Sequence, residues 1–205
     1  HEFYCQGTFN HNTSSARIFT RALNCEHQHS NGDACGHCQV CTTNLDQSPF
    51  YIEYDSSQLR LETIRSIVDT WYVSISNGYR VIVFDESHLL SRQVQSALLK
   101  VFEEPPANTF FLLCTTDIDK MLPTIRSRSL EIRLDTISTE DMKSNILSVC
   151  STYSIDIDDE VIDRIIKVSK GHMRDCHMQI DTYRMMGKQQ YFELFKSSYD
   201  AIAKY

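Results

Sequence analysis

The sequence predicts an α/β fold with a parallel sheet, followed by a small helical domain. Two continuous apolar runs, Val81–Phe84 and Thr109–Cys114, have the composition of strands buried on both faces, which is typical of parallel sheets. A helical pattern beginning at Ser91 lies between them, and this alternation favours crossover connections. In the last third of the chain every pattern is helical. We therefore expect an α/β domain over residues 1–136 and a helical domain over residues 137–205.

Shorter patterns predict the remaining elements. Ser91 suits the N-cap of the helix between the two strands, and Pro105-Pro106 end that helix. Further strands are expected in three segments: His1–Gln6, the segment around Tyr51, and the segment around Leu130–Ile132. The helical domain should contain three helices, which begin near polar residues: Ser138, Asp158 and Asp175. We expect the second of these helices to end at Gly171 and the third at Met186.

Composition excludes several classes of protein. Hydrophobic residues make up 41% of the 205, and no apolar run approaches the roughly 18 residues of a membrane span. A net charge of -7 argues against nucleic-acid binding by the whole surface, although a local basic patch or a DNA channel shared in an assembly stays open. Scattered single cysteines are typical of buried thiols in a reducing compartment, so we expect a cytoplasmic protein. The chain begins without methionine or a signal peptide, and we expect an excised fragment or a missing beginning.

Four of the cysteines lie close together, with the spacing C-x9-C-x2-C-x2-C. A C-x2-C turn aims two thiolates at one ion, and four thiolates complete the tetrahedral coordination of a structural zinc site. The predicted ligands of this zinc knuckle, over residues 25–41, are Cys25, Cys35, Cys38 and Cys41. A reduced, metal-free knuckle or a disulfide pair is the alternative. Three histidines are candidate substitute ligands: His27, His29 and His37.

The stretch GTFNHNTSS stands where a phosphate-binding loop would lie, between a strand and the helical stretch Ala16–Asn24. Such a loop reads G-x-x-x-x-G-K-[ST]. Gly7 and Ser14 match this pattern, but Asn12 replaces the second glycine and Thr13 replaces the lysine. Thr13 supplies no positive charge to phosphates, whereas asparagine tolerates left-handed backbone, so part of a phosphate cradle can persist. We expect weak or absent nucleotide binding.

An acidic pair, Asp85 and Glu86, directly follows the first buried strand. Carboxylates at the carboxyl end of such a strand lie where open α/β sheets bind ligands. One of them can hold magnesium through water, and the other can polarise an attacking water. An apolar strand followed by two acids is common, so the pair alone is a weak indication of function.

Taken together, these segments resemble the AAA+ subunits of bacterial-type DNA polymerase III clamp loaders, the gamma/tau and delta-prime group. The resemblance runs from His1 to about Lys188 and rests on the degraded P-loop, the cysteine cluster, VIVFDESHLL, ALLKVFEEPPANTFFLLCTTD, LPTIRSRS and GHMRD. It implies an AAA+ domain with a zinc knuckle insert, followed by a three-helix lid. It also implies that the helical collar and the N-terminal adenine-binding segment of this family are missing here.

The resemblance assigns roles to further residues. Subunits of this family bind ATP between neighbours, and an arginine in a Ser-Arg-Cys motif reaches the nucleotide of the next subunit. Here the motif reads Ser127-Arg128-Ser129, which makes Arg128 the candidate arginine finger. Thr116 matches the family's sensor position, and Arg174 matches the lid arginine that reaches bound nucleotide. Surface ion pairs are the alternative for both arginines, and Arg126 is the nearest competitor of Arg128.

The family also contacts DNA through helix N-termini that face a central channel. The helix beginning near Ser91, with Arg92 as its first basic residue, would be placed there. Such a contact positions phosphates and does not read sequence. A solvated helix start is the alternative.

The resemblance implies a clamp-loader subunit that helps open a sliding clamp and load it on primed DNA. The degraded loop is similar to delta-prime, which donates its arginine without hydrolysing ATP, whereas the acidic pair, Thr116 and Arg174 are similar to gamma. Recent loss of ATPase activity, deliberate mutation and a divergent viral clamp loader each fit this mixture. An active ATPase that binds ATP and Mg²⁺ through an atypical loop is the alternative, and a zinc-stabilised adaptor outside replication is a third reading. Expected partners are other AAA+ clamp-loader subunits in a pentamer-like hetero-oligomer, the sliding clamp and primed DNA, with no membrane.

Overall fold

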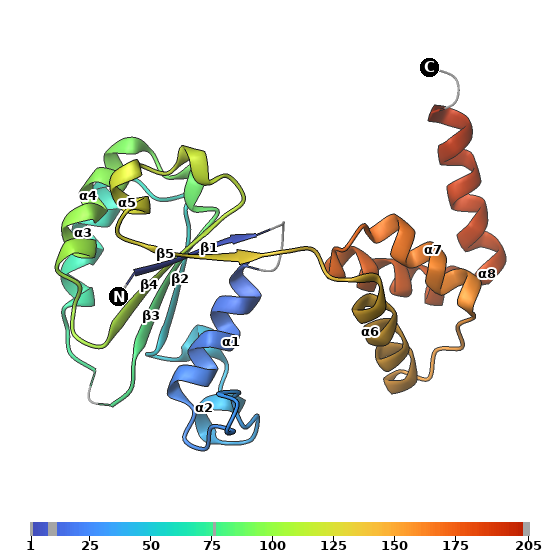
Figure 1. Cartoon of the computed structure of the whole chain (residues 1–205), viewed down its shortest axis with the longest axis horizontal. Coiled ribbons are helices and arrows are strands. Elements are labelled where there is room, and N and C mark those ends of the chain that lie inside the picture. Colours follow the sequence, from blue (N-terminus) through green and yellow to red (C-terminus); the bar gives the residue numbers. More distant parts are fainter. Residues whose placement is uncertain (1, 8–11, 76, 203–205) are drawn as a thin grey trace. The chain divides into compact units, whose positions relative to one another are not determined.

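A computed structural model of the chain describes residues 2–7, 12–75 and 77–202, with side chains for residues 13–75 and 77–194. The chain divides into two compact units, His1–Asp135 and Thr136–Tyr205. Unit 1 combines a sheet with helices, whereas the described part of unit 2 is helical (Figure 1). The α/β class with a parallel sheet and C-terminal helices, predicted from the apolar runs, is confirmed.

Unit 1 is built on a five-stranded parallel sheet with the strand order β2-β3-β4-β1-β5. The strands are β1 (Glu2–Gly7), β2 (Tyr51–Asp55), β3 (Arg80–Asp85), β4 (Thr109–Thr115) and β5 (Leu130–Leu134). The register pairs Gln6 with Thr115 and Phe84 with Leu113. The carboxyl ends of β1, β3 and β4 therefore meet at one edge of the sheet, where ligands bind in open α/β folds.

Helices cover both faces of this sheet (Figure 1). The helices of unit 1 are α1 (Asn12–Asn24), α2 (Gln39–Thr42), α3 (Leu61–Trp71), α4 (Arg92–Glu103) and α5 (Pro123–Arg126), with short 3-10 helices η1 (Leu45–Gln47), η2 (Ser87–Leu89) and η3 (Ile118–Lys120). Successive side chains of β3 point to opposite faces. Val81 and Val83 accordingly pack with α1, and Ile82 and Phe84 pack with α3 and α4. The continuous apolar run in β3 is thus explained by burial on both sides.

Helix α1 begins earlier than the sequence pattern indicated. The apolar spacing predicted a helix from Ala16, but the described helix starts at Asn12. Thr13 and Ser14 therefore belong to its first turn and not to a loop. Polar residues are favourable at helix starts, so the apolar pattern alone could not locate this boundary.

Unit 2 contains α6 (Thr139–Thr152), α7 (Asp159–Ser169) and α8 (Met173–Ile202). Ser138 and Asp158 cap the first two of these helices through their side-chain oxygens. The first helical segment of α8 runs up to Met186, as predicted, because the backbone of Gly187 is not helical, with a φ of 74° and a ψ of 168°; a second helical segment, which was not predicted, follows it. Tyr191 of the second segment is fully buried and packs in the core of this unit. In the described residues no helix has the length and apolar character needed to cross a membrane.

A buried glutamine joins α4 to the segment that leads into α5. Gln95 is 1% exposed, and its Nε2 donates to the carbonyl oxygens of Leu90 at 3.0 Å and Lys120 at 3.3 Å. Its Oε1 accepts the N–H of Leu122, the residue before α5, at 2.8 Å. One side chain therefore satisfies three backbone groups of two loops, which fixes the start of α5 relative to α4.

Replacing Gln95 with methionine should lower the free energy of unfolding by about 1–3 kcal/mol, because backbone groups that Gln95 satisfies would stay buried without partners. Chemical denaturation measures this change. Gln93→Met in the same helix is the matched control, since Gln93 is exposed and its replacement should change stability by less than about 0.5 kcal/mol. Equal losses in the two variants would contradict the structural role of Gln95.

Candidate functional site

The acidic pair lies in a tight turn at the carboxyl edge of the sheet. Asp85 ends β3, and Glu86 follows in the left-handed conformation with a φ of 50°. The Glu86 N–H donates to Asp85 Oδ1 at 3.0 Å, and the buried Ser87 hydroxyl donates to the Cys114 carbonyl of β4 at 3.0 Å. A left-handed residue other than glycine costs about 1–2 kcal/mol. These hydrogen bonds hold the turn in that conformation.

His88 connects Glu86 with the end of β4. Its Nδ1 lies 3.3 Å from Glu86 Oε2 and 3.2 Å from Thr115 Oγ1. The Glu86 carboxylate therefore faces an imidazole of its own chain. Sequence reasoning missed both His88 and Thr115. The spacing of two residues between Glu86 and His88 was the available signal, but Thr115 is 27 residues further on and is brought there by the fold.

The predicted sensor residue, Thr116, is the first residue after β4 and is half-buried. The hydroxyl that meets His88 belongs to the preceding residue, Thr115, which also accepts the N–H of Asp117 at 3.0 Å. Asp117 in turn pairs with Lys120 at 3.1 Å, and the hydrogen bond from Lys120 lowers the pKa of Asp117. Of the two neighbouring threonines, Thr115 is the one in hydrogen-bond contact with the turn that carries the acidic pair.

The predicted nucleotide loop lies partly outside the described residues, which omit positions 8–11. Gly7 ends β1, while Thr13 and Ser14 lie in the first turn of α1. That turn, residues 12–15, contains no lysine or arginine. It offers a helix N-terminus to an anion but no formal positive charge.

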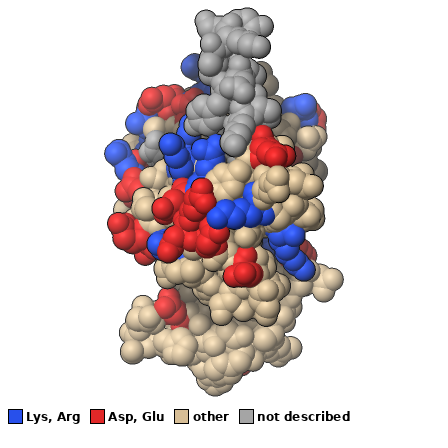
Figure 2. Space-filling model, turned by 90° about the vertical axis from the view of Figure 1, so that its right-hand side faces the viewer, with Lys and Arg blue, Asp and Glu red and all other residues tan. Residues whose placement is uncertain are grey.

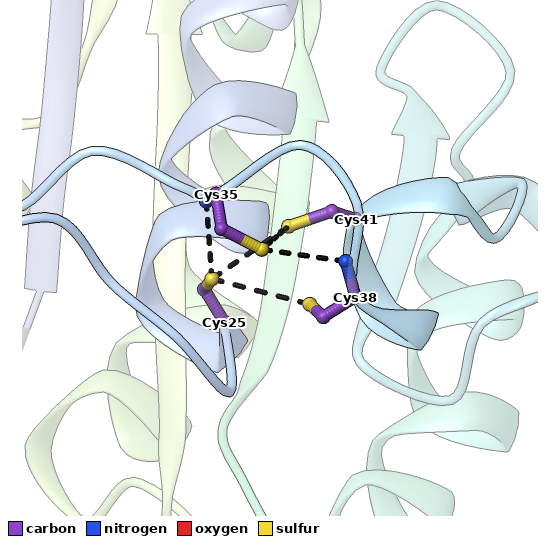
Figure 3. Close-up of side chains that lie close together, drawn as sticks. All are labelled: Cys25, Cys35, Cys38 and Cys41. Atoms are coloured by element: carbon purple, nitrogen blue, oxygen red, sulfur yellow. Dashed lines mark hydrogen bonds between the residues drawn. The ribbon is translucent and has the colours of Figure 1, made fainter.

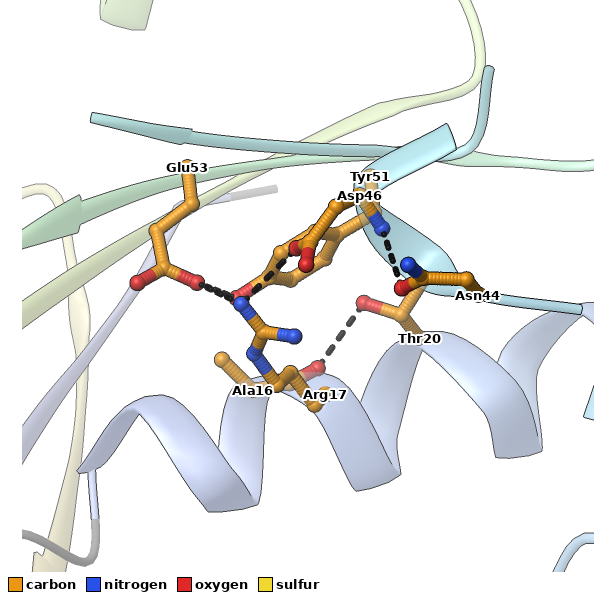
Figure 4. A network of polar contacts seen from close by, with 7 residues as sticks. All are labelled: Ala16, Arg17, Thr20, Asn44, Asp46, Tyr51 and Glu53. Carbon is orange, nitrogen blue, oxygen red and sulfur yellow. Dashed lines mark hydrogen bonds and ion pairs between the residues drawn. The ribbon is translucent and has the colours of Figure 1, made fainter. Parts of the chain in front are cut away.

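The first basic residue of α1 is Arg17, and its guanidinium points from the helix toward Asp46 and Glu53 (Figure 4). Arg17 Nη2 lies 2.9 Å from Asp46 Oδ1 of η1 and 2.9 Å from Glu53 Oε2 of β2. Its guanidinium carbon lies 5.0 Å from the centre of the Tyr51 ring, and the Tyr51 hydroxyl donates to Glu53. These contacts pin α1 to η1 and β2.

The two arginines of the LPTIRSRS segment are held by different acids. Arg126 ends α5, and its Nη1 lies 3.2 Å from Asp119 Oδ1. Arg128 Nη2 lies 2.9 Å from Glu103 Oε1, and Arg128 Nη1 donates to the Thr124 carbonyl at 2.9 Å. The Arg128 side chain stays 41% exposed, so a group outside the chain can reach it.

The remaining predicted site residues lie at helix starts. Ser91 caps α4 by accepting the N–H of Val94 at 3.3 Å, which confirms it as the N-cap. Arg92 is the first residue of α4 and is exposed. Arg174 is the second residue of α8, in unit 2, and is also exposed.

The four clustered cysteines converge on one point (Figure 3). All four Sγ atoms lie within 4.8 Å of one another. The Sγ–Sγ distances are 4.0 Å between Cys25 and Cys38, 3.7 Å between Cys25 and Cys41, and 3.9 Å between Cys35 and Cys41. A regular tetrahedron of zinc–sulfur bonds of about 2.3 Å has edges of about 3.8 Å, whereas a disulfide needs about 2.05 Å. The geometry therefore fits a four-thiolate metal site and not a disulfide pair.

The three nearby histidines do not belong to this group. In the described part of the chain, the clustered ligand atoms at this site are those of the four cysteines. His27 and His37 stack on each other with ring centres 6.3 Å apart, and His37 Nδ1 lies 2.9 Å from the Cys35 carbonyl oxygen. His29 is exposed. The thiolates alone account for a complete tetrahedral site.

Backbone N–H groups prepare some of these thiols as ligands. The N–H of Cys35 donates to Cys25 Sγ at 3.2 Å and lowers the pKa of Cys25. The N–H groups of Glu26 and Cys41 lower the pKa of Cys38 to about 6. Burial instead raises the pKa of Cys41 to about 12. A cation between the four sulfurs would favour the thiolate form of each.

We expect the purified chain to contain one zinc ion per molecule, as measured by atomic emission spectrometry. Loss of a residue that only supports a metal ligand weakens metal binding by about 10–100-fold. Cys38→Ala removes a ligand itself, so it should weaken zinc binding by more than this and should lower the melting temperature. Cys150→Ala, which removes a buried cysteine of unit 2, is the control and should keep the zinc. Full zinc content in the Cys38→Ala protein would contradict the four-thiolate site.

Comparison with known sequences finds similarity to subunits of DNA polymerase III. It is 33% identical over 174 residues to DNA polymerase III subunit gamma/tau of Mycobacterium tuberculosis, an alignment that covers 82% of this chain and 30% of that protein. It is 34% identical to subunit tau/gamma of Haemophilus influenzae (87% and 26% covered) and 36% identical to subunit gamma of Buchnera aphidicola (80% and 46% covered). The chain thus spans less than half the length of these relatives.

Solved structures agree on the fold. The Thermotoga maritima RuvB Holliday junction branch migration motor superposes with a TM-score of 0.66 over 91% of this chain and 54% of its own, at 18% identity. That likeness shows an AAA+ fold and carries no function. The protein-family model described as DNA polymerase III, delta subunit, matches residues 3–138, which include the cysteine cluster, the acidic pair and Arg128. The resemblance read from the motifs is thereby confirmed, and the chain belongs to this DNA polymerase III subunit family.

Proposed function

We propose that the chain acts as a clamp-loader subunit that does not hydrolyse ATP itself and donates Arg128 to nucleotide bound by a neighbour. In this role it helps open a sliding clamp and load it on primed DNA. Membership of a DNA polymerase III subunit family supports the clamp-loader part of the proposal. The partners would be other AAA+ clamp-loader subunits, the clamp and primed DNA.

The first turn of α1 carries the proposal that this chain does not hydrolyse ATP. A working loop places a lysine there against the outer phosphates, and Thr13 occupies its position. Arg17, one helical turn further on, is bound by Asp46 and Glu53. Each of these ion pairs is partly exposed and weak by itself, but two carboxylates and the Tyr51 ring together favour this position of the Arg17 guanidinium over one beside a phosphate. Nucleotide would therefore lack the positive charge that its outer phosphates require.

The surroundings of Arg128 support its role as the donated residue. Two groups of its own chain, the Glu103 carboxylate and the Thr124 carbonyl, fix its guanidinium, and its side chain is nevertheless partly exposed. An oriented and accessible guanidinium is what stabilisation of charge on a transferring phosphoryl group requires. Arg126, the competing candidate, is equally exposed and is also paired with an acid, Asp119, so Arg128 is preferred because it is the arginine of the Ser127-Arg128-Ser129 motif.

We further propose a structural role for zinc and a lid role for unit 2. Cys25 directly follows α1, whose last residue, Asn24, accepts the Tyr79 N–H at 2.7 Å and donates to the Tyr79 carbonyl at 3.0 Å. A zinc ion held by the four thiolates would close the segment between Cys25 and Cys41 and stabilise this junction with β3. Four protein ligands leave no open coordination position, so the ion would not take part in catalysis. Arg174, exposed at the start of α8, is the residue by which a lid would reach nucleotide.

An active ATPase is the second candidate, favoured by the retained acidic pair. Asp85 and Glu86 lie at the sheet edge where such enzymes hold magnesium and polarise water. In this alternative Asp85 would hold a hydrated magnesium ion. Glu86 would break its contact with His88 and polarise the attacking water. The contact between Glu86 and His88 favours the first candidate, because it gives the second acid a partner within the chain.

For DNA we propose contact only within the assembly, through Ser91 and Arg92 at the start of α4. The net charge is -7, and acidic and basic side chains lie intermingled on the face drawn in Figure 2. Such a surface does not favour tight binding of DNA by the isolated chain. One arginine and a helix N-terminus could position phosphates once neighbouring subunits add their own.

Arg128→Ala should lower ATP hydrolysis in the assembled complex by roughly 10³-fold at the site next to this chain, because the transition state would lose its trans-acting charge. Steady-state hydrolysis, with the other nucleotide sites inactivated, measures this effect. Arg126→Ala is the matched control, since it removes an arginine of the same segment that has its own acid partner. Unchanged hydrolysis in Arg128→Ala, or an equal loss in Arg126→Ala, would contradict the assignment.

A further inference from the structure

The position of Glu103 is not explained by the stability of its own helix. Glu103 is the last residue of α4, and Glu104 is the C-cap. The carboxyl end of a helix carries partial negative charge, so acidic side chains there are unfavourable. The Arg128 guanidinium, 2.9 Å from Glu103 Oε1, compensates the charge of one of the two acids. Glu104 has no ion pair among the described residues, so the two acids differ in their surroundings.

We propose that Glu103 is the positioning residue for Arg128: its carboxylate orients the guanidinium for the nucleotide of the neighbouring subunit. This inference rests on the proposed function of Arg128. It adds a second residue to that function and assigns a role to the first glutamate of the EEPP segment.

The backbones on both sides of the pair are fixed, which allows the contact to set an orientation. Gln95 ties α4 to the residue before α5. Ile125 of α5 is 1% exposed, and its carbonyl accepts the N–H of Arg128 at 3.0 Å and the Ser129 hydroxyl at 2.9 Å. These contacts connect the two backbone segments that carry Glu103 and Arg128.

Hydrogen-bond donors remain for a phosphate after these contacts are made. Each Nη atom of a guanidinium carries two hydrogens, and Arg128 gives one from Nη2 to Glu103 and one from Nη1 to Thr124. The second hydrogen of each is left for an outside acceptor. Both side chains of the ion pair are about half exposed, at 41% and 50%. Such a pair is weak, so it can orient Arg128 without competing strongly with a phosphate.

The test compares Glu103→Gln with Glu104→Gln in the assembled complex, with Arg128→Ala measured beside them. Glutamine keeps the size and polarity of the side chain and removes the charge. Loss of an exposed ion pair corresponds to a change of about two- to fivefold, so Glu103→Gln should lower kcat by that factor at the site next to this chain. KM and the melting temperature should stay unchanged, because neither nucleotide binding nor folding depends on the orientation of Arg128. Glu104→Gln should leave kcat unchanged.

The outcomes separate the two proposals. A fall in kcat with Glu103→Gln but not with Glu104→Gln supports the positioning role. An unchanged or raised kcat with Glu103→Gln, while Arg128→Ala is inactive, overturns it and leaves the finger intact; a raised value would mean that Glu103 holds Arg128 back. If Arg128→Ala has no effect on kcat, both the role of Arg128 as an arginine finger and the positioning role of Glu103 are contradicted. Nuclear magnetic resonance of the Arg128 side-chain N–H groups in the isolated chain gives a second readout, because their signals should broaden in Glu103→Gln and not in Glu104→Gln.

Discussion

Strand β3 lies between β2 and β4, and the side chains of Val81, Ile82, Val83 and Phe84 are all fully buried. Because burying an unpaired carboxylate is costly, a strand that is covered on both faces favours acidic residues only at its end. The register with β4 then brings that end beside Thr115, and the Ser87 hydroxyl fastens the turn to the Cys114 carbonyl. The place of the acidic pair, and of the helix that follows it, depends on this burial.

Several charged side chains of unit 1 have partners within the chain. Glu86 faces His88, and Asp117 faces Lys120. Arg17 is drawn by Asp46 and Glu53 toward η1 and β2. Each of these charged side chains contacts an oppositely charged side chain or an imidazole of the same chain. Arg128, by contrast, is oriented by its partner and remains accessible, which fits a chain that acts on a neighbour's nucleotide.

Features that depend on neighbouring residues could be predicted from the sequence. The apolar run in β3 indicated a strand buried on both faces, and the cysteine spacing predicted a cluster that the Sγ separations confirm. The N-cap at Ser91 was predicted for the same reason, since a cap involves residues three positions apart.

Contacts between distant segments could not be predicted in this way. Arg17 meets residues 29 and 36 positions away, and His88 meets a residue 27 positions away. The partner of Arg128 depends on how α4 and α5 pack against each other, and the spacing of apolar residues along the sequence does not predict this packing. Helix α8 breaks at Gly187, but the second helical segment beyond it was not predicted, because it packs through Tyr191 in the core of unit 2.

We propose that this chain lacks the charge needed to hold nucleotide and acts on the nucleotide of a neighbour. Calorimetric titration of the folded, zinc-loaded chain with ATP and magnesium tests it most directly. We expect no binding heat at nucleotide concentrations up to about 1 mM, which corresponds to a binding free energy weaker than about -4 kcal/mol. Micromolar binding would contradict it, because the first turn of α1 would then supply a phosphate site without a lysine, and Asp85 and Glu86 would become the catalytic pair of an active ATPase.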